Sequence, residues 1–247
     1  MRKTVQIRYT LIPFLYTLFY NVNTNGGTVA RSLIHEFPTD KGTYNIDEQF
    51  LWGSGLLISP VLYPSRTSIQ AYFPFEARWY DYYTGKEMSA GLKTISAPRD
   101  FIPLHVRGGH IIPTQEPGAN TNESRTKPFG LIIAPDKTEK ATGSLYWDDG
   151  ESFDSIQSRR FSYFEFSYYQ LNAETVIEIK AKSLGYSLSN KLNKIRLFDV
   201  RLRPTQVLID SAIQHSSFSW NSVNEDLELT NLNLSLNEDH NILIKYL

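Results

Sequence analysis

Several ingredients of common functional sites are missing from this chain of 247 residues. It contains no cysteine, which excludes disulfide bonds, thiolate nucleophiles, iron–sulfur clusters and cysteine-based zinc sites. Its 25 Lys and Arg residues nearly balance 26 Asp and Glu residues, and the formal net charge is -1, so no overall field attracts nucleic acid or anionic lipid. Neither a dinucleotide-binding fingerprint nor a Gly-x-Ser-x-Gly nucleophile elbow occurs. We therefore predict no nucleic-acid partner and no cofactor.

The chain also lacks a long hydrophobic run. Its main apolar stretch covers residues 9–20, whereas a helix that spans a bilayer needs about 20 apolar residues. The basic residues Arg2 and Lys3 precede this stretch, as they would in a signal peptide, but Arg8 interrupts the pattern and no small-x-small cleavage site follows. We expect neither a transmembrane segment nor a signal peptide in this chain.

Aromatic residues, by contrast, are abundant. They make up 13% of the sequence, which excludes disorder and favours β structure, where rings pack on pleated faces. The clearest helical pattern covers residues 9–20 and is apolar nearly all round, so this helix should be buried on several sides. Gly26 and Gly27 should end it, and a buried strand is predicted over 28–34. A short helix capped by Asp47 is predicted over 47–52.

Beyond residue 53 the pattern is that of a β protein. Strands are predicted over 56–62, 70–73 and 78–82, and residues 101–113 have the form of a hairpin that turns at Gly108-Gly109. Pro, Gly, Asn and Ser then dominate 114–127, which predicts a domain boundary near 128. After it come seven short apolar segments that indicate a β-sandwich, at 130–133, 143–147, 161–166, 175–180, 194–198, 227–229 and 242–244.

The densest group of carboxylates follows Trp147 and comprises Asp148, Asp149, Glu151 and Asp154. Carboxylates beside an aromatic ring suit a glycosidase or a calcium site. However, Asp-Gly with a nearby Ser is ordinary turn chemistry, and the spacing does not match a calcium loop. We interpret the segment as a solvated turn and keep a bound cation, and then a new hydrolytic site, as alternatives.

The histidines do not have the spacing of a metal site. His35 and Glu36 follow the predicted strand at 28–34, but adjacent residues on an extended chain point in opposite directions. They can face one substrate only if the strand has already ended, so we favour a structural role for both. His105, His110, His215 and His240 are scattered, and no metal ligand is predicted among them.

Two sequons, at Asn122 and Asn233, are candidate acceptors for N-glycans, and they matter only if the chain enters the secretory pathway. The aromatic run over 79–83 could stack on sugar rings, but alternating aromatic residues in a strand more often pack in a core. We favour packing for this run.

Taken in order, eight segments of the chain resemble the C-terminal part of glycoside hydrolase family 31, and they are closest to its animal α-glucosidases of the maltase-glucoamylase, sucrase-isomaltase and lysosomal type. These segments are IRYTLIPFLY (7–16), VARSLIHEF (29–37), QFLWG (49–53), LISPVL (57–62), WYDYYTG (79–85), LHVRGG (104–109), TQEP (114–117) and YWDDGE (146–151). One residue departs from the pattern, because Ser32 stands where the family usually has proline.

The resemblance implies a mainly β fold that follows a truncated (β/α)8 barrel. Residues 1–53 would supply the last helix and strand of the barrel, 54–128 a proximal C-terminal β-domain and 129–247 a distal β-sandwich. Since such a barrel takes roughly 250 residues, most of it would lie outside this chain. Met1 to Gln6 match nothing in the family, so the resemblance begins inside an element that should be buried, and we expect the chain to be a fragment.

The resemblance also bears on function. Family members hydrolyse α-glucosides with an aspartate nucleophile, in a Trp-x-Asp-Met-Asn-Glu type motif, and an aspartate acid/base, both upstream of these segments. Neither motif occurs here, so we assign no catalytic and no metal-binding residue and expect the chain alone to be inactive. In a full-length enzyme the partners would be an α-glucoside or oligosaccharide and the missing barrel, in a secretory, lysosomal or membrane-tethered protein. The alternative is a stand-alone non-catalytic β module that binds carbohydrate or a protein partner.

Overall fold

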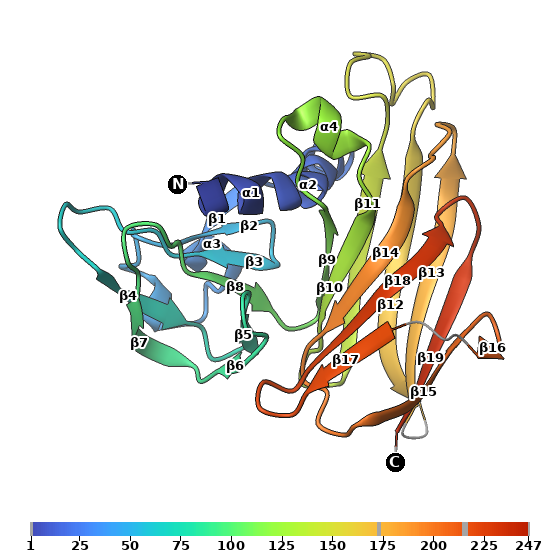
Figure 1. The fold of residues 1–247 in the computed structure, drawn as a ribbon. Helices are drawn as coiled ribbons and strands as arrows, with labels where there is room; N and C mark the ends of the chain where they lie inside the picture. Colours follow the sequence, from blue (N-terminus) through green and yellow to red (C-terminus); the bar gives the residue numbers. More distant parts are fainter. Residues whose placement is uncertain (1, 172–173, 214–216, 247) are drawn as a thin grey trace.

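The computed structural model describes residues 2–171, 174–213 and 217–246 and shows a mainly β protein with a few helices (Figure 1). The helices lie at the N-terminus and in two connections: α1 (Arg2–Thr10), α2 (Ile12–Asn25), α3 (Leu33–Glu36), the 3-10 helix η1 (Lys41–Thr43) and α4 (Thr121–Arg125). No helix in the described part of the chain is long and apolar enough to cross a membrane.

The smaller β region holds two sheets. A six-stranded sheet has the order β1 (Ala30–Ser32), β2 (Phe50–Trp52), β3 (Leu56–Ile58), β8 (Leu104–Arg107), β5 (Trp79–Asp81) and β6 (Glu87–Met88). Beside it, β4 (Ser68–Phe73) pairs with β7 (Gly91–Ser96).

The larger region is one eleven-stranded sheet that rolls back on itself around a single core (Figure 1). Its order is β16 (Ala212–Ile213), β15 (Pro204–Ile209), β19 (His240–Tyr246), β13 (Glu174–Leu184), β12 (Ser162–Leu171), β11 (Lys140–Trp147), β9 (His110–Gln115), β10 (Phe129–Ala134), β14 (Lys191–Leu197), β18 (Asp226–Ser235) and β17 (Ser217–Asn221). All seven strands predicted beyond residue 128 are confirmed. They belong to one hydrogen-bonded sheet rather than to the two sheets of a sandwich.

The predicted N-terminal helix is α2, which carries Pro13 in its first turn and ends at Gly26 with φ 76°. Proline suits the start of a helix because its missing N–H has no partner there, and glycine tolerates the left-handed conformation at the end. The helix lies against β11: the Tyr20 and Tyr146 rings stack at 4.2 Å, and the Tyr146 N–H donates to Thr17 Oγ1 at 3.0 Å. It therefore joins the N-terminus to the large sheet.

The buried strand predicted over 28–34 is present only as β1, which is three residues long, largely exposed and paired antiparallel with β2. The strands of a (β/α)8 barrel pair in parallel, so this pairing does not support a barrel assignment for β1. Helix α3 begins directly after it. Ser32, at the start of α3, has φ -71°, a value that proline also adopts, so this backbone accommodates either residue.

Two further sequence predictions fail for reasons of tertiary packing. The helix expected over 47–52 is replaced by β2, whose Leu51 is completely buried. The expected hairpin at Gly108-Gly109 does not form, because β8 pairs with β3 and β5 while β9 pairs with β10 and β11. The two glycines instead carry the chain from one sheet to the other, where a Cβ on Gly108 would lie 2.6 Å from the Pro135 carbonyl oxygen.

Candidate functional site

The carboxylate-rich loop after β11 is anchored by Asp148, which is 2% exposed. Its carboxylate accepts hydrogen bonds from the hydroxyls of Tyr16 (2.8 Å), Tyr146 (2.6 Å) and Ser155 (2.7 Å) and from the Gly150 N–H (2.8 Å). Burial alone would raise the pKa of Asp148, but these hydrogen bonds favour the ionised form and hold the pKa below the usual value. Asp148 is thus a structural anion with no oxygen left for chemistry.

Asp149 shapes the exposed end of the same loop. Its carboxylate accepts from the Ser152 side chain and from the backbone N–H groups of Glu151 (3.0 Å) and Ser152 (2.9 Å). The Ser152 hydroxyl and these two N–H groups lower the pKa of Asp149 to about 2. The turn interpretation is confirmed at Asp149, but the segment is not solvated throughout, because Asp148 is buried.

Arg125 closes the loop from the side of α4. Its guanidinium lies 4.3 Å from the centroid of the Trp147 ring, and it donates to the Asp148 carbonyl oxygen. Helix α4 is capped by Asn120, whose side chain accepts from the Glu123 N–H. This helix falls in the stretch 114–127 that the sequence presents as irregular.

A cavity of about 490 Å³ lies between α2, α4 and this loop. It brings together three of the residues that the sequence singled out, Asn122, Asp149 and Glu151. Its other lining residues are mainly polar: Ile12, Tyr16, Gln115, Thr121, Ser124, Arg125 and Gly150. The mixture of hydroxyl, amide and carboxylate groups can hydrogen-bond a polar ligand, and Asp148 is not among the lining residues.

Glu36 has the structural role that we favoured. It accepts from Arg31 at 2.8 Å and from Arg107 at 2.6 Å, and these two guanidinium groups outweigh the effect of burial and lower the pKa of Glu36. His35 is exposed. The strand does end before residue 35, and both residues lie in the short helix α3.

The remaining histidines are dispersed. His105 is completely buried and packs on Phe73, His110 contacts Ser54, and His240 lies 2.7 Å from an Asp210 carboxylate oxygen. His215 lies outside the described residues. Within residues 2–171, 174–213 and 217–246, no three His, Asp or Glu side chains are placed to hold a metal ion.

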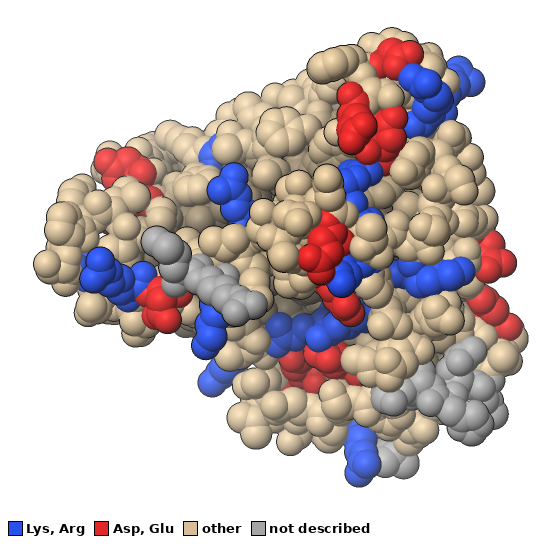
Figure 2. Space-filling model, turned by 45° about the horizontal axis from the view of Figure 1, so that its top comes forward, with Lys and Arg blue, Asp and Glu red and all other residues tan. Residues whose placement is uncertain are grey.

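The other candidate residues divide between surface and core. Asn122 and Asn233 are both exposed, and whether either carries a glycan stays a prediction. In the aromatic run, Trp79 and Tyr80 are completely buried and Tyr82 is 8% exposed, which confirms packing rather than a sugar platform. Figure 2 shows Lys and Arg interspersed with Asp and Glu over the face that it presents.

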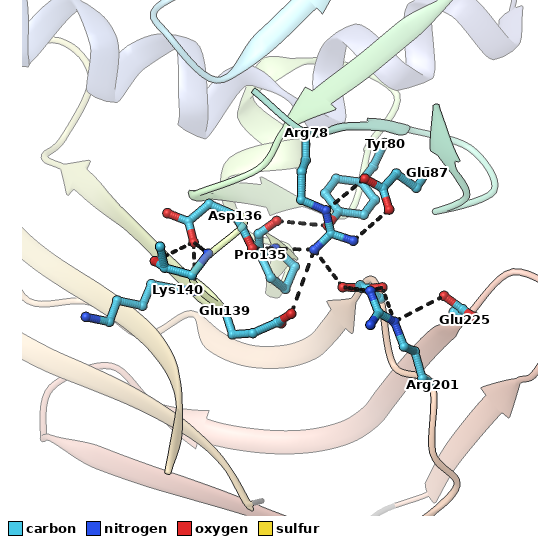
Figure 3. A network of polar contacts seen from close by, with 11 residues as sticks. Arg78, Tyr80, Glu87, Pro135, Asp136, Glu139, Lys140, Arg201 and Glu225 are labelled. Atoms are coloured by element: carbon cyan, nitrogen blue, oxygen red, sulfur yellow. Dashed lines mark hydrogen bonds and ion pairs between the residues drawn. The ribbon is translucent and has the colours of Figure 1, made fainter. Parts of the chain in front are cut away.

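Sequence reasoning missed the largest ionic network, which is centred on Arg78 (Figure 3). Its guanidinium donates twice to Glu87, at 2.8 and 2.7 Å, and lies 2.7 Å from Asp199. This network links β5 of the six-stranded sheet to loops of the large sheet, and the Tyr80 hydroxyl adds a 2.8 Å bond to the Pro135 carbonyl oxygen. An arginine directly before a buried Trp-Tyr pair is the signal in the sequence, since a charge there needs partners.

A model of the glycosyl hydrolase family 31 C-terminal domain matches residues 26–112. Across the whole chain, sucrase-isomaltase of Rattus norvegicus is 42% identical over 241 residues, which is 95% of this chain and 13% of that protein. Lysosomal alpha-glucosidase of Mus musculus is 35% identical over 93% of this chain and 26% of its own length. The chain belongs to the C-terminal region of glycosyl hydrolase family 31.

Solved structures of family 31 agree with this assignment. A Flavobacterium johnsoniae GH31 dextranase complexed with isomaltotriose matches 99% of this chain with a TM-score of 0.84 and 25% identity. The chain covers 32% of that dextranase, so it spans less than a third of the dextranase and a smaller share of the two relatives above. The family match begins at residue 26, before β1.

Proposed function

We propose that this chain is the C-terminal part of a family 31 α-glucosidase and that it supports a catalytic barrel without hydrolysing glycosides itself. The observation that carries the proposal is the alignment of 95% of the chain with only 13% of rat sucrase-isomaltase. The residues that precede the matched region in such relatives would form the barrel, and an α-glucoside or oligosaccharide would be the substrate of the complete enzyme.

The arrangement of the helices supports this proposal. One side of α2 is held by β11 through Tyr16, Thr17 and Tyr20. Phe19, on another side of α2, is 56% exposed, so this side of the helix is open to a further element of a longer protein. We infer that α2 is the last helix of the barrel.

The limits of the three domains, 1–53, 54–128 and 129–247, stay a proposal. Strand pairing crosses both limits, since β2 pairs with β3 and β9 pairs with β10. The proximal and distal β-domains of the proposal correspond best to the six-stranded and eleven-stranded sheets.

The chemistry of a retaining glycosidase supports the inactivity of the isolated chain. Such an enzyme needs two carboxyl groups about 5–5.5 Å apart, one as nucleophile and one as acid. The Asp148 carboxylate is already saturated by four donors, and Asp149 is held by its own turn. A secretory, lysosomal or membrane-tethered location, with glycans at Asn122 and Asn233, is proposed on the family resemblance.

A chimera tests the proposal. Rat sucrase-isomaltase in which this chain replaces the matched C-terminal segment should hydrolyse maltose, and the 247-residue chain alone should not. As a control, the chimera carrying Phe14→Asp should lose activity, because Phe14 is 8% exposed in the core beneath α2. Hydrolysis by the isolated chain would overturn the proposal, as would a folded but inactive chimera.

The same proteins address the alternative of a stand-alone carbohydrate-binding module. The cavity between α2, α4 and the 148–155 loop is the feature that favours it. Retention of the isolated chain on immobilised maltose, lost on Glu151→Gln, combined with an inactive chimera, would establish that alternative.

A further inference from the structure

A second cavity, of about 340 Å³, opens at one end of the rolled sheet. Four strands run in the same direction and end here: β10, β12, β14 and β19. Strand β14 is parallel to β10. Strand β12 is antiparallel to its neighbours β11 and β13, and β19 is antiparallel to β13, so β12 and β19 also share one direction. The ends of a rolled sheet are common places for ligands, and small-molecule clefts have volumes of about 300–1,000 Å³. No role follows for this cavity from the proposed function.

The lining of the cavity combines apolar surface with hydrogen-bonding groups. Leu202 is 56% exposed, and the Tyr246 ring is fixed by a 2.8 Å hydrogen bond between its hydroxyl and Thr175 Oγ1. Gln170 is exposed and offers both a donor and an acceptor. Together with Glu139 and Arg201 these residues line the cavity, which gives it an apolar side and a polar rim, as a sugar ring requires.

Glu139 is the group in the cavity whose charge is least compensated. Its nearest cation is the Arg78 guanidinium at 4.0 Å, a separation too long for a hydrogen bond. Arg78 is already occupied by Glu87 and by Asp199. Burial and the neighbouring Asp199 carboxylate raise the pKa of Glu139, as expected for a carboxylate without a close partner.

The charges around the cavity do not balance. Figure 3 shows Glu87, Glu139 and Arg201 gathered about the Arg78 guanidinium, with Glu225 beyond Arg201. The cavity itself is lined by two carboxylates, Glu139 and Asp199, and by one guanidinium group, that of Arg201, while Glu87 and Glu225 pair with Arg78 and Arg201 from outside it. The excess of negative charge favours a ligand that brings a positive one.

The backbone is strained at Glu139 and Asp199, the two carboxylate residues that line the cavity. Glu139 and Asp199 both have positive φ, 56° and 60°, a conformation that non-glycine residues rarely adopt. The Glu139 N–H bonds to the Asp136 carbonyl oxygen at 3.2 Å, and Asp199 also pairs with Arg201. Strain of this kind persists where the surroundings impose it.

We propose that this cavity binds a single sugar ring that carries an ammonium group. The ring would lie against Leu202 and Tyr246, its hydroxyls would bond to Gln170 and Arg201, and its ammonium group would pair with Glu139. The proposal does not depend on the catalytic barrel.

Glucosamine and glucose form a matched pair of probes, because they differ at one position by an ammonium group in place of a hydroxyl. Titration calorimetry of the 247-residue chain, as isolated and at pH 6.5 in low salt, should give roughly tenfold tighter binding of glucosamine, the ratio that corresponds to about 1.4 kcal/mol. Glu139→Gln should abolish this preference. Glu238→Gln, which removes an exposed carboxylate outside the cavity, should leave it unchanged.

Arg201→Gln should change the preference for glucosamine in the opposite direction to Glu139→Gln. It removes a cation that is 61% exposed at the rim of the cavity, so the preference for glucosamine should increase. Equal binding of both sugars would overturn the proposal, as would binding of neither by chain that melts cooperatively. A preference that survives Glu139→Gln in protein with the wild-type melting temperature would also overturn it.

Discussion

The eleven-stranded and six-stranded sheets differ in the origin of their cores. The core of the large sheet is formed entirely by residues from 111 to 244. The core beneath α2 combines Leu11 and Phe14 of the helical segment with strands of the six-stranded sheet and with Ile112, Ile132 and Phe198 on the outer side of the large sheet. The smaller region therefore shares one of its two cores with the larger one, whereas the core inside the rolled sheet contains no residue of the smaller region.

Buried polar groups without a hydrogen-bond partner also distinguish the six-stranded region from the eleven-stranded one. Among the described residues, the buried side-chain atoms without a hydrogen-bond partner are Thr28 Oγ1, Arg31 Nε and both ring nitrogens of His105. All of them lie before residue 106, in the smaller region. Since buried polar groups are normally paired, we expect the six-stranded sheet to be the less stable of the two.

Truncation should give the largest difference between the regions. A fragment of residues 108–247 keeps β9 and should unfold cooperatively on heating. A fragment of residues 129–247 should not, because β9 pairs with β10 at six positions from Phe129–Gln115 to Ala134–His110 and supplies Ile111 to the core. Circular dichroism during a thermal scan measures both. Equal melting of the two fragments would place the domain boundary at 128, as the sequence predicts.

A pair of Phe→Ala substitutions compares the two regions directly. Phe164, in the large sheet, and Phe37, beside Trp79, are both completely buried, and each change should cost about 3–5 kcal/mol. Phe164→Ala should speed amide hydrogen exchange in both regions, whereas Phe37→Ala should speed it in the smaller region alone. Faster exchange throughout the chain in Phe37→Ala would show that the regions unfold as one unit.

His105 should make the smaller region sensitive to acid. Burial lowers the pKa of His105 from the ordinary 6.5 to about 4, so the unfolded chain takes up a proton more readily than the folded one between these values. Stability should fall as the pH falls from 6.5 to 4, by about 3 kcal/mol in total, since one pKa unit is worth about 1.4 kcal/mol.

The matched variant is His105→Leu, which removes the two unpaired nitrogens. Its free energy of unfolding in urea should lose about half of this pH dependence, because burial also lowers the pKa of His110 to about 4 and His110 remains in this variant. An unchanged pH dependence in this variant would assign the effect to another group.

Segments with a strong local pattern could be predicted from the sequence. The run 130–133 identifies β10, because both faces of that strand are buried, Leu131 and Ile133 in one core and Ile132 in the other. The turn at Asp149 follows from Asp-Gly chemistry. Pairing between strands could not be predicted in this way: Gly108-Gly109 has the composition of a hairpin turn, yet Gly108 N–H bonds to the Arg78 carbonyl and Gly109 N–H to that of Ala134.

The candidate sites show the same limit. Asp148, Asp149 and Glu151 could be found because they are neighbours in sequence, although the burial of Asp148 under Tyr16 could not. Glu139 and Asp199 are 60 positions apart and share the Arg78 network only through the fold. Neither residue stands out from its local sequence, so only the structure brings them together.

The smallest effect is expected at the contact that joins α2 to the large sheet. Asp148→Asn should cost about 1.5–3 kcal/mol, because hydrogen bonds to a charged group contribute that much and an amide cannot accept from all three hydroxyls. The pKa of Asp148 is lowered in the folded protein, so its contribution is present above pH 3.8 and is lost as the pH falls through the folded value. Asp148→Asn should remove this acid dependence, whereas Glu238→Gln, at an exposed position outside this loop, is the control.

A double-mutant cycle with Tyr16→Phe separates this contact from the rest of the Asp148 site. Tyr16 comes from α2, whereas Tyr146 and Ser155 belong to the large region, so the coupling energy between Tyr16 and Asp148 measures what the helix gains from the loop. We expect about 0.5–3 kcal/mol, the range for residues in contact. A coupling near zero would mean that the Tyr16–Asp148 contact adds nothing to the hold on α2, which would then rest on ring stacking, burial and the hydrogen bond between Tyr146 N–H and Thr17 Oγ1.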